Sequence, residues 1–328
     1  LAMLALALLV LVLLACGGGN GGDASRTATS GSDGAGEAVV RDTLRRGNGP
    51  EPDTLDPQRA RTDSSFNILR DLFEGLTAIG PEGKPVPAAA ESWTVSADGL
   101  EYVFRLREGL RWSNGDPLVA ADFMAGMRRL VDPATASPYA QVFDPVVNAA
   151  AILRGQRPPE TLGVSAPDQR TLVIRLEHPA PYLLGLLAQP GTFPIHGPSL
   201  AQYGAEHARP GRMVSNGAFV LKDWVVGSQI VAERNPSYWN AAATQVARVH
   251  FVHHADAGAE FRQYRAGELD FTYTVPPQQY AWLRENLPDE LHLSPQLNVY
   301  YYGFNLSRPP FKDNPDLRRA LSLAIDRE

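Results

Sequence analysis

Apolar and polar residues alternate in several stretches of the chain and predict β-strands there. Residues 101–107 and 171–177 each carry apolar side chains at every second position, so one face of each strand is apolar. The dipeptide Asp98-Gly99 predicts a hairpin that joins the first of these strands to residues 93–95. A second hairpin is predicted where Gly227-Ser228 separates AFVLKDW from QIVAERN. These strands and turns form one part of a mixed α/β pattern.

Apolar residues at helical spacing occur between the predicted strands. In AADFMAGMRRLVD, Phe123, Met127 and Leu130 stand at i, i+4 and i+7 and predict a helix. The stretch AEFRQYRAGELDF predicts a second helix, closed by Gly267 and followed by a strand at residues 269–271. Helices and strands that alternate in this way predict an α/β fold.

A last helix is predicted to begin at Asn314 as N-cap, with Pro315 at its first position. One face of this helix is apolar and consists of Leu317, Ala320, Leu321 and Ala324. The helix runs to Glu328 without a stop signal, so we expect the chain to be cut at its C-terminal side.

The first fifteen residues are all apolar and are followed by Cys16, the one cysteine of the chain. Fifteen helical residues reach only ~23 Å, which is short of the ~30 Å hydrocarbon core of a bilayer. A signal peptide that ends in small residues fits better, and Leu13-Leu14-Ala15-Cys16 resembles a bacterial lipobox. We therefore expect residues 1–16 to be a lipoprotein signal peptide with Cys16 as the site of lipid attachment. No basic residue precedes the run, so we expect the chain to be cut at its front as well.

Residues 17–36 contain eight glycines and three serines, which is typical of a flexible tether. Such a tether spans ~25 Å as a random coil. It suits a folded protein held at a distance from a lipid anchor.

The composition is that of an ordinary globular protein: 44% of the 328 residues are hydrophobic and 20% are charged. This length predicts two domains. The formal net charge of −6 gives no reason to expect nucleic-acid binding. A single cysteine cannot form an intramolecular disulfide, so compartment is inferred from the N-terminal segment alone.

The chain carries no recognisable catalytic or metal-binding motif. The stretch GPEGKP at residues 80–85 lacks the pattern of a phosphate-binding loop and is interpreted as a turn. His250, His253 and His254 could suggest a metal site, but on a strand His250 and His254 would be ~13 Å apart. We interpret these histidines as half-solvated residues at a strand end, and we expect no metal site.

Two further features leave more than one interpretation. Asp53 and Asp56 could act as an acid pair, although Pro57 after them favours turn formation. The tyrosines at 300–302 could belong to the core or face a ligand. From the residues alone, the chain is a secreted, lipid-tethered α/β protein without a catalytic constellation.

Beyond these patterns, the body of the chain resembles the family 5 extracellular solute-binding proteins, which are the oligopeptide- and dipeptide-binding proteins of ABC importers. The resemblance is carried by NGPEPDTLDPQRA with NILRDLFEGL, by PAAAESWTVSADGLEYVFRLREGLRWSNGDPLVAADF, by DPATASPYA, by SNGAFVLKDWVVGSQIVAERNPSYWN, by YRAGELDFTYTVPP and by YYYGFNLSRPPFKDNPDLRRALSLAIDRE. The combination of ASPYA, TYTVPP and YYYGFN is most similar to the oligopeptide-binding branch.

The resemblance implies an α/β, periplasmic-binding-protein-like clamp of two lobes (type II, with an extra inserted domain), truncated in the second lobe. Residues 37–73 and 198–298 would form the first lobe, and residues 74–197 the inserted domain. Residues 299–328 would begin the second lobe, whose remainder is missing.

In this family an extended peptide lies between the lobes, where backbone pairing supplies affinity and roomy, hydrated pockets accept side chains. Carried over by motif, the ligand-binding residues would be Arg61, Thr62, Asp63, Tyr139, Gln189, Tyr273, Thr274 and Tyr301. Gln189 stands where a relative has histidine, and Gly303 stands where the oligopeptide relative has glutamate. Val119 replaces a usual Ser or Thr cap of the following helix.

The function that the resemblance implies is capture of oligopeptides and their delivery to a membrane permease, with ATP hydrolysis by partner subunits. We expect no enzyme activity, no cofactor and no nucleic-acid partner, and we expect a monomer anchored by lipid in the periplasm or cell envelope. The same fold could bind a dipeptide, a nickel chelate, haem or an opine instead. The chain could also be a secreted hydrolase that uses Asp53 and Asp56, or a truncated relic that binds nothing.

Overall fold

The structure is a computed structural model, and it describes residues 42–293 and 301–326. The predicted signal peptide with Cys16 and the predicted tether at 17–36 lie outside the described residues. In the part of the chain that is described, no helix is both long and apolar enough to cross a bilayer.

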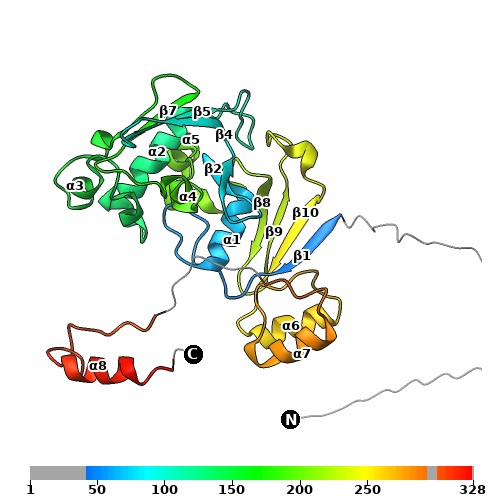
Figure 1. Cartoon of the computed structure of the whole chain (residues 1–328). Coiled ribbons are helices and arrows are strands. Elements are labelled where there is room, and N and C mark those ends of the chain that lie inside the picture. The colour runs from blue at the N-terminus through cyan, green and yellow to red at the C-terminus, as the bar shows by residue number, and fades with distance from the viewer. Residues whose placement is uncertain (1–41, 294–300, 327–328) are drawn as a thin grey trace, which may run out of the picture. The chain divides into compact units, whose positions relative to one another are not determined.

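One four-stranded sheet combines the start of the described chain with residues about 200 positions later. Its order is β1-β10-β9-β8. The strands are β1 (Thr43–Gly47), β8 (Phe219–Val225), β9 (Gln229–Arg234) and β10 (Arg248–Val252). β1 pairs in parallel with β10, and the other pairs are antiparallel (Figure 1). The predicted hairpin at Gly227-Ser228 is confirmed, with a bulge in β8 between Leu221 and Asp223.

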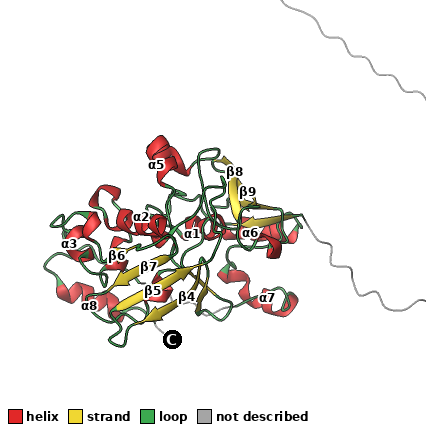
Figure 2. Ribbon diagram, turned by 90° about the horizontal axis from the view of Figure 1, so that it is seen from above, coloured by secondary structure: helices red, strands yellow, loops and turns green. Residues whose placement is uncertain are grey.

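A second four-stranded sheet is formed within residues 90–175, in the order β4-β5-β7-β6. Its strands are β4 (Ala90–Val95), β5 (Glu101–Leu106), β6 (Val164–Ser165) and β7 (Thr171–Arg175), all antiparallel to their neighbours (Figure 2). The predicted hairpin at Asp98-Gly99 is confirmed. Tyr102, Phe104 and Leu106 are buried together, as their alternation predicts.

A short hairpin and the helices complete the described chain. β2 (Thr77–Ile79) and β3 (Pro85–Pro87) flank the stretch GPEGKP, which forms the predicted turn. The α-helices are α1 (Asp63–Leu72), α2 (Ala120–Val131), α3 (Ala149–Leu153), α4 (Leu183–Leu186), α5 (Gly197–Tyr203), α6 (Ala257–Arg265), α7 (Tyr280–Asn286) and α8 (Pro315–Leu323). Short 3-10 helices lie at Pro133–Thr135, Ala140–Phe143, Pro159–Thr161, Pro190–Thr192, Gly204–Ala208, Ala241–Ala243 and Pro277–Gln279.

The apolar positions predicted for α2 form its buried face. Phe123, Met127 and Leu130 are fully buried, and the helix lies against β6 and β7. Val119 provides no side-chain cap, as its sequence predicts, but the Val119 N–H donates to Asp122 Oδ2 at 3.0 Å. The start of α2 is therefore only half capped.

Two local predictions are wrong. Residues 269–271 form no strand; Phe271 makes only an isolated bridge to Arg46 of β1. The predicted strand end with half-solvated histidines is wrong for His254 alone, which is buried; His250 on β10 and His253 just beyond its end are half-buried. After Val252 the chain leaves the sheet for α6, and beyond α6 it meets β1 again only through the bridge at Phe271.

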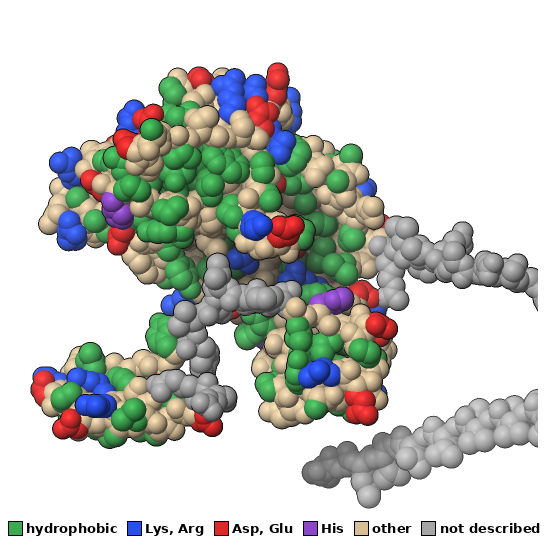
Figure 3. All heavy atoms as spheres, viewed as in Figure 1, with side chains coloured by type: hydrophobic (Ala, Val, Ile, Leu, Met, Phe, Trp, Pro, Cys, Tyr) green, Lys and Arg blue, Asp and Glu red, His purple; other side chains and the backbone are tan. Residues whose placement is uncertain are grey.

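The core joins both sheets. Buried apolar residues of one cluster come from α1, α2 and both four-stranded sheets, and they include Leu55, Ile68, Phe104 and Phe251. α1 lies against β8. The predicted boundaries between the first lobe (37–73 and 198–298) and the inserted domain (74–197) stay a prediction. On the face drawn in Figure 3, acidic and basic side chains are interspersed.

Candidate functional site

The predicted site residues Arg61, Thr62 and Asp63 form the entry to α1. Thr62 is the N-cap, and its Oγ1 accepts a hydrogen bond from the Ser65 N–H at 3.3 Å. Asp53 holds the same turn, because its Oδ1 accepts from Thr62 Oγ1 at 3.0 Å and from Ser65 Oγ at 2.8 Å. Burial raises the pKa of Asp53, but these hydrogen bonds more than offset it, so the pKa lies below its usual range. The turn is thus fixed by its own polar groups.

Tyr139 lies beside this turn. Its hydroxyl donates to the Arg61 carbonyl at 3.1 Å, and its ring packs against Phe66 with centroids 5.6 Å apart. Arg61 itself extends outward and pairs with Asp53 at 3.2 Å. Tyr139 is 39% exposed, so part of its ring packs against Phe66 and part remains accessible. That arrangement suits contact with a ligand.

Tyr273 reaches the same helix end from a distant part of the chain. Its hydroxyl donates to Asp63 Oδ2 at 3.4 Å, across 210 residues of sequence. Burial and the charge of Asp63 raise the pKa of Tyr273, so this hydroxyl remains a donor at neutral pH. Thr274, the next residue, is exposed. These two predicted residues therefore border the surface that the α1 entry forms.

Gln189 is joined to α1 through an arginine. Its Oε1 accepts from Arg70 Nη2 at 3.3 Å, and the Arg70 guanidinium lies 5.9 Å from the centre of the Phe66 ring. Five segments of sequence, at 53, 61–70, 139, 189 and 273, thus meet through direct side-chain contacts around α1. Tyr301 is the exception: it is 78% exposed and lies in the separate described range 301–326.

Sequence reasoning missed a cluster of charged residues on and beside α1. Burial raises the pKa of Asp71 to about 6, although the charges of Arg46 and Arg70 lower it. The Arg46 guanidinium lies 5.2 Å from the centre of the Phe271 ring. No sequence motif connects these residues, because Arg46 is on β1. Arg70 and Asp71 are in the last turn of α1, at the opposite end from Thr62.

Asp53 and Asp56 do not act together in this structure. Asp56 is buried and pairs with Arg129 at 2.6 Å and with His207 at 3.3 Å. Burial raises the pKa of Asp56, but Arg129 and His207 outweigh this and hold it well below its usual range. General acid catalysis needs a carboxyl group whose pKa is raised toward neutrality. Neither aspartate has that property, and the buried ion network of Asp56 is a contact that sequence analysis missed.

The histidines are held apart by the fold. His250 lies on β10, where burial lowers its pKa, whereas His254 is buried and its Nε2 lies 2.9 Å from Gln263 Oε1. Among residues 42–293 and 301–326, no group of three or more His, Cys, Asp or Glu side chains could hold a metal ion.

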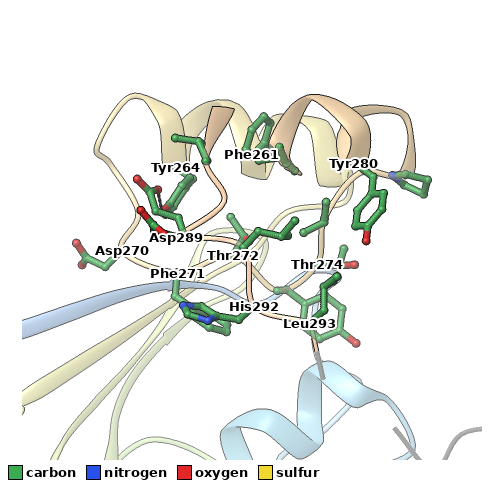
Figure 4. A pocket seen from close by; sticks show the side chains of 17 residues that line it. Phe261, Tyr264, Asp270, Phe271, Thr272, Thr274, Tyr280, Asp289, His292 and Leu293 are labelled. Carbon is green, nitrogen blue, oxygen red and sulfur yellow. Dashed lines mark hydrogen bonds between the residues drawn. The ribbon is translucent and has the colours of Figure 1, made fainter. Parts of the chain in front are cut away.

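An open cavity of about 940 Å³ borders the site at Tyr273 and Thr274. Its wall is formed by α6, α7 and the segments at 270–275 and 289–293. Figure 4 shows Asp270 and Asp289 at one end of the cavity and Tyr280 at the other. Phe261, Phe271, Leu283 and Leu287 add apolar surface. The cavity suits an apolar or aromatic group, and its acidic end disfavours an anion.

The polar end of this cavity is also organised. Asp270 accepts from Arg45 Nη2 at 2.9 Å, and Tyr264 donates a short hydrogen bond to Glu290. That hydrogen bond raises the pKa of Tyr264 to about 12. The first pair joins β1 to the 270–275 segment, and the second joins α6 to the 289–293 segment.

Comparison with known protein sequences points to a single family. The family model of the bacterial extracellular solute-binding proteins, family 5 Middle, matches residues 84–328. The chain is 44% identical to YgiS of Escherichia coli, described as a probable deoxycholate-binding periplasmic protein, and 41% identical to its periplasmic oligopeptide-binding protein OppA. The matches cover 87% and 88% of this chain and 53% of each relative.

Solved structures give the same result. OppA of Haemophilus influenzae in complex with the peptide RPPGFSPFR has a TM-score of 0.83 and 37% identity, and the murein tripeptide binding protein MppA of Escherichia coli has 0.83 and 38%. Each match covers 87% of this chain and 56% of the solved chain. The chain thus spans about half the length of its relatives. The predicted α/β, periplasmic-binding-protein-like fold is confirmed by this likeness.

Proposed function

This chain belongs to the family 5 bacterial extracellular solute-binding proteins, and we propose that it captures extended oligopeptides and presents them to the membrane permease of an ABC importer. A relative at 41% identity is named an oligopeptide-binding protein, and a structure at 37% identity holds a nonapeptide. The proposal extends these properties to a chain that spans about half of those proteins.

The observation that carries the proposal is the gathering of polar and aromatic groups around the entry of α1. Thr62, Tyr139 and Tyr273 come from three distant parts of the sequence, and each is held by a partner other than solvent. Groups that are already oriented lose little conformational entropy when a ligand arrives. A surface of this kind suits recognition better than catalysis. The pKa values of Asp53 and Asp56 are both lowered, so neither can serve as a general acid near neutral pH.

An oligopeptide fits the chemistry of this surface. An extended peptide presents N–H and C=O groups at regular spacing, and backbone pairing binds it without selecting its side chains. The open cavity beside Tyr273 and Thr274 can receive a bulky side chain together with water, which satisfies polar groups that find no protein partner. We propose Arg61, Thr62, Asp63, Tyr139, Gln189, Tyr273, Thr274 and Tyr301 as ligand-contacting residues.

Isothermal titration calorimetry with the peptide RPPGFSPFR tests this proposal on the 328-residue chain. We expect saturable binding with a Kd of about 1 mM or tighter. Asp63→Asn should weaken binding, because Asp63 faces the Tyr273 hydroxyl, and the control Glu82→Gln in the exposed β2–β3 turn should not. No saturable heat from the folded chain would contradict the proposal.

A second candidate ligand is an amphipathic steroid. The relative at 44% identity is described as probable deoxycholate-binding, and the cavity beside Tyr273 is large and partly apolar. The carboxylate of deoxycholate is disfavoured by the acidic end of that cavity, so we rank it below a peptide. Titration of deoxycholate in the same calorimeter separates the two ligands.

We further propose that the protein acts as a monomer in the cell envelope, attached by lipid at Cys16, and that partner subunits hydrolyse ATP. Relatives are named periplasmic proteins, which supports the compartment. Incorporation of labelled palmitate in a bacterial host should be lost in Cys16→Ser. Equal labelling of that variant would contradict the anchor.

A further inference from the structure

Glu260 of α6 is a buried carboxyl group close to the proposed peptide site. Its side chain is 1% exposed, although it is a charged residue in the first turn of a helix. A carboxyl group buried to this degree requires hydrogen-bond donors or an opposite charge. Sequence analysis assigned it no role, because a single glutamate near a helix start is ordinary.

The donors are backbone amides of two segments far apart in sequence. Glu260 Oε1 accepts a short hydrogen bond from the Tyr273 N–H, and Oε2 accepts from the Gly49 N–H at 3.3 Å. His254 Nδ1 lies 3.8 Å from Oε2 and adds a titratable neighbour. The carboxyl group therefore joins the end of β1 to the segment that carries Tyr273.

Two glycines make room for this junction. A Cβ on Gly47 would collide with the carboxyl group of Glu260, and a Cβ on Gly49 would lie 2.8 Å from the ring of Tyr273. Gly49 also has φ +64°, which favours glycine. The Gly47 N–H donates to the Phe271 carbonyl at 2.8 Å, so the junction continues the contact between β1 and the 271–273 segment.

Each side of the junction leads to one part of the proposed site. On one side, Tyr273 places its hydroxyl against Asp63 at 3.4 Å. On the other side, Asn48, which precedes Gly49, donates from Nδ2 to the Ser64 carbonyl at 3.0 Å in the first turn of α1. One buried carboxyl group is thus connected to both Tyr273 and the α1 entry.

We propose that Glu260 is a positioning residue that sets the location of Tyr273 relative to the α1 entry and thereby controls peptide affinity. This inference rests on the proposed function. Glu260 does not touch the peptide; it acts through the Gly49 and Tyr273 amides. In Glu260→Gln an NH2 group replaces one of the two carboxylate oxygens, so one of these amides loses its acceptor and the other keeps only an uncharged one, and Tyr273 moves away from Asp63.

The test compares Glu260→Gln with Glu285→Gln, a matched change at an exposed position of α7. Hydrogen exchange measured by mass spectrometry should become faster in peptides that contain residues 47–49 and 271–274 in the first variant alone. Affinity for RPPGFSPFR should fall by about tenfold, as expected when hydrogen bonds to a charged group are lost. Gly47→Ala should reproduce both effects, because its methyl group displaces the carboxyl group.

A double-mutant cycle distinguishes positioning from general support. Tyr273→Phe should weaken binding in the wild-type background and have little further effect in Glu260→Gln, because Tyr273 has already left Asp63. Unchanged affinity in Glu260→Gln, additive effects in the cycle, or unchanged exchange in the two segments would each overturn the inference. If the wild-type chain binds no peptide, the proposed function fails, and the exchange measurements still decide whether Glu260 fixes the two segments.

Discussion

Helices α1 and α8 begin in the same way: Thr62 Oγ1 accepts the Ser65 amide at 3.3 Å, and Asn314 Oδ1 accepts the Leu317 amide at 3.1 Å. Each helix carries an aspartate in its first turn and spans nine or ten residues. Their surroundings differ. α1 buries Ser64, Ser65, Ile68, Leu69 and Leu72, whereas α8 buries no residue.

The difference shows that capping and amphipathic spacing specify a helix without specifying its burial. Leu69 is fully buried against the core that both sheets share, while Leu323 is 71% exposed. Full burial of such a side chain contributes about 1.5–3 kcal/mol to stability. α1 can therefore present Thr62 and Asp63 as fixed groups, and this support comes from packing rather than from its cap.

The largest effect is expected where the loop before α1 is anchored. Asp56 and Arg129 pair at 2.6 Å with side chains that are 5% and 16% exposed. Arg129→Ala leaves the Asp56 carboxylate buried without its guanidinium partner and should lower the free energy of unfolding by about 3–5 kcal/mol. Urea unfolding followed by circular dichroism measures this change.

The exposed pair Arg61–Asp53 provides the control, because Arg61 is 70% exposed. Arg61→Ala should cost at most about 1 kcal/mol. The pKa of Asp56 is lowered in the folded state, so its contribution is present above about pH 4 and is lost as the pH falls through the folded pKa. A wild-type chain and an Arg129→Ala variant with equal stability at pH 7 would show that the pair does not anchor the loop.

The second prediction tests the helices themselves. Leu69→Ala should destabilise the protein by about 2–5 kcal/mol, because it leaves a cavity in the core. Leu323→Ala in α8 should change the free energy of unfolding by no more than about 0.5 kcal/mol. Equal losses in the two variants, measured by urea unfolding, would mean that α8 is packed in solution and would remove the contrast between the helices.

The third prediction concerns Asp71 in the last turn of α1. Its pKa is raised to about 6 in the folded state, above the unfolded value of about 3.9. The folded state then binds the proton more tightly, so the contribution of Asp71 to stability is full below about pH 4 and is lost as the pH rises through 6. Between about pH 4 and pH 6, the free energy of unfolding of the wild type should fall by about 1–3 kcal/mol more than that of Asp71→Asn. Parallel pH profiles of the two proteins would contradict this.

Local elements are predictable from sequence, whereas long-range contacts are not. The hairpin at Asp98-Gly99 and the buried face of α2 follow from turn residues and apolar spacing within about a dozen positions. Residues 269–271 carry a strand pattern, yet Phe271 forms only one bridge, because the availability of a partner strand depends on the tertiary fold.

The candidate site shows the same division. The resemblance to a known family points to Tyr139 and Tyr273, and the structure places both beside α1. Sequence alone suggests a turn residue or an acid at Asp56, because its partner Arg129 is 73 residues away. Glu260 escapes sequence analysis for a similar reason: its acceptor role depends on amides 13 and 211 positions away.

The smallest effect is expected when the N-cap side chain, which both helices have, is removed. Thr62→Ala deletes a cap of the buried helix and should lower the free energy of global unfolding by about 1 kcal/mol, because α1 unfolds only with the core. Asn314→Ala deletes the equivalent cap of α8, and we expect its cost to appear as faster hydrogen exchange within residues 315–323, with global unfolding unchanged. The two caps are chemically similar. If one variant changes global unfolding and the other changes only local hydrogen exchange, the difference must come from the packing of the two helices. If Asn314→Ala lowered the global stability as much as Thr62→Ala, the two helices would have to share one cooperative unit, and the exposed face of α8 could not be a separate region.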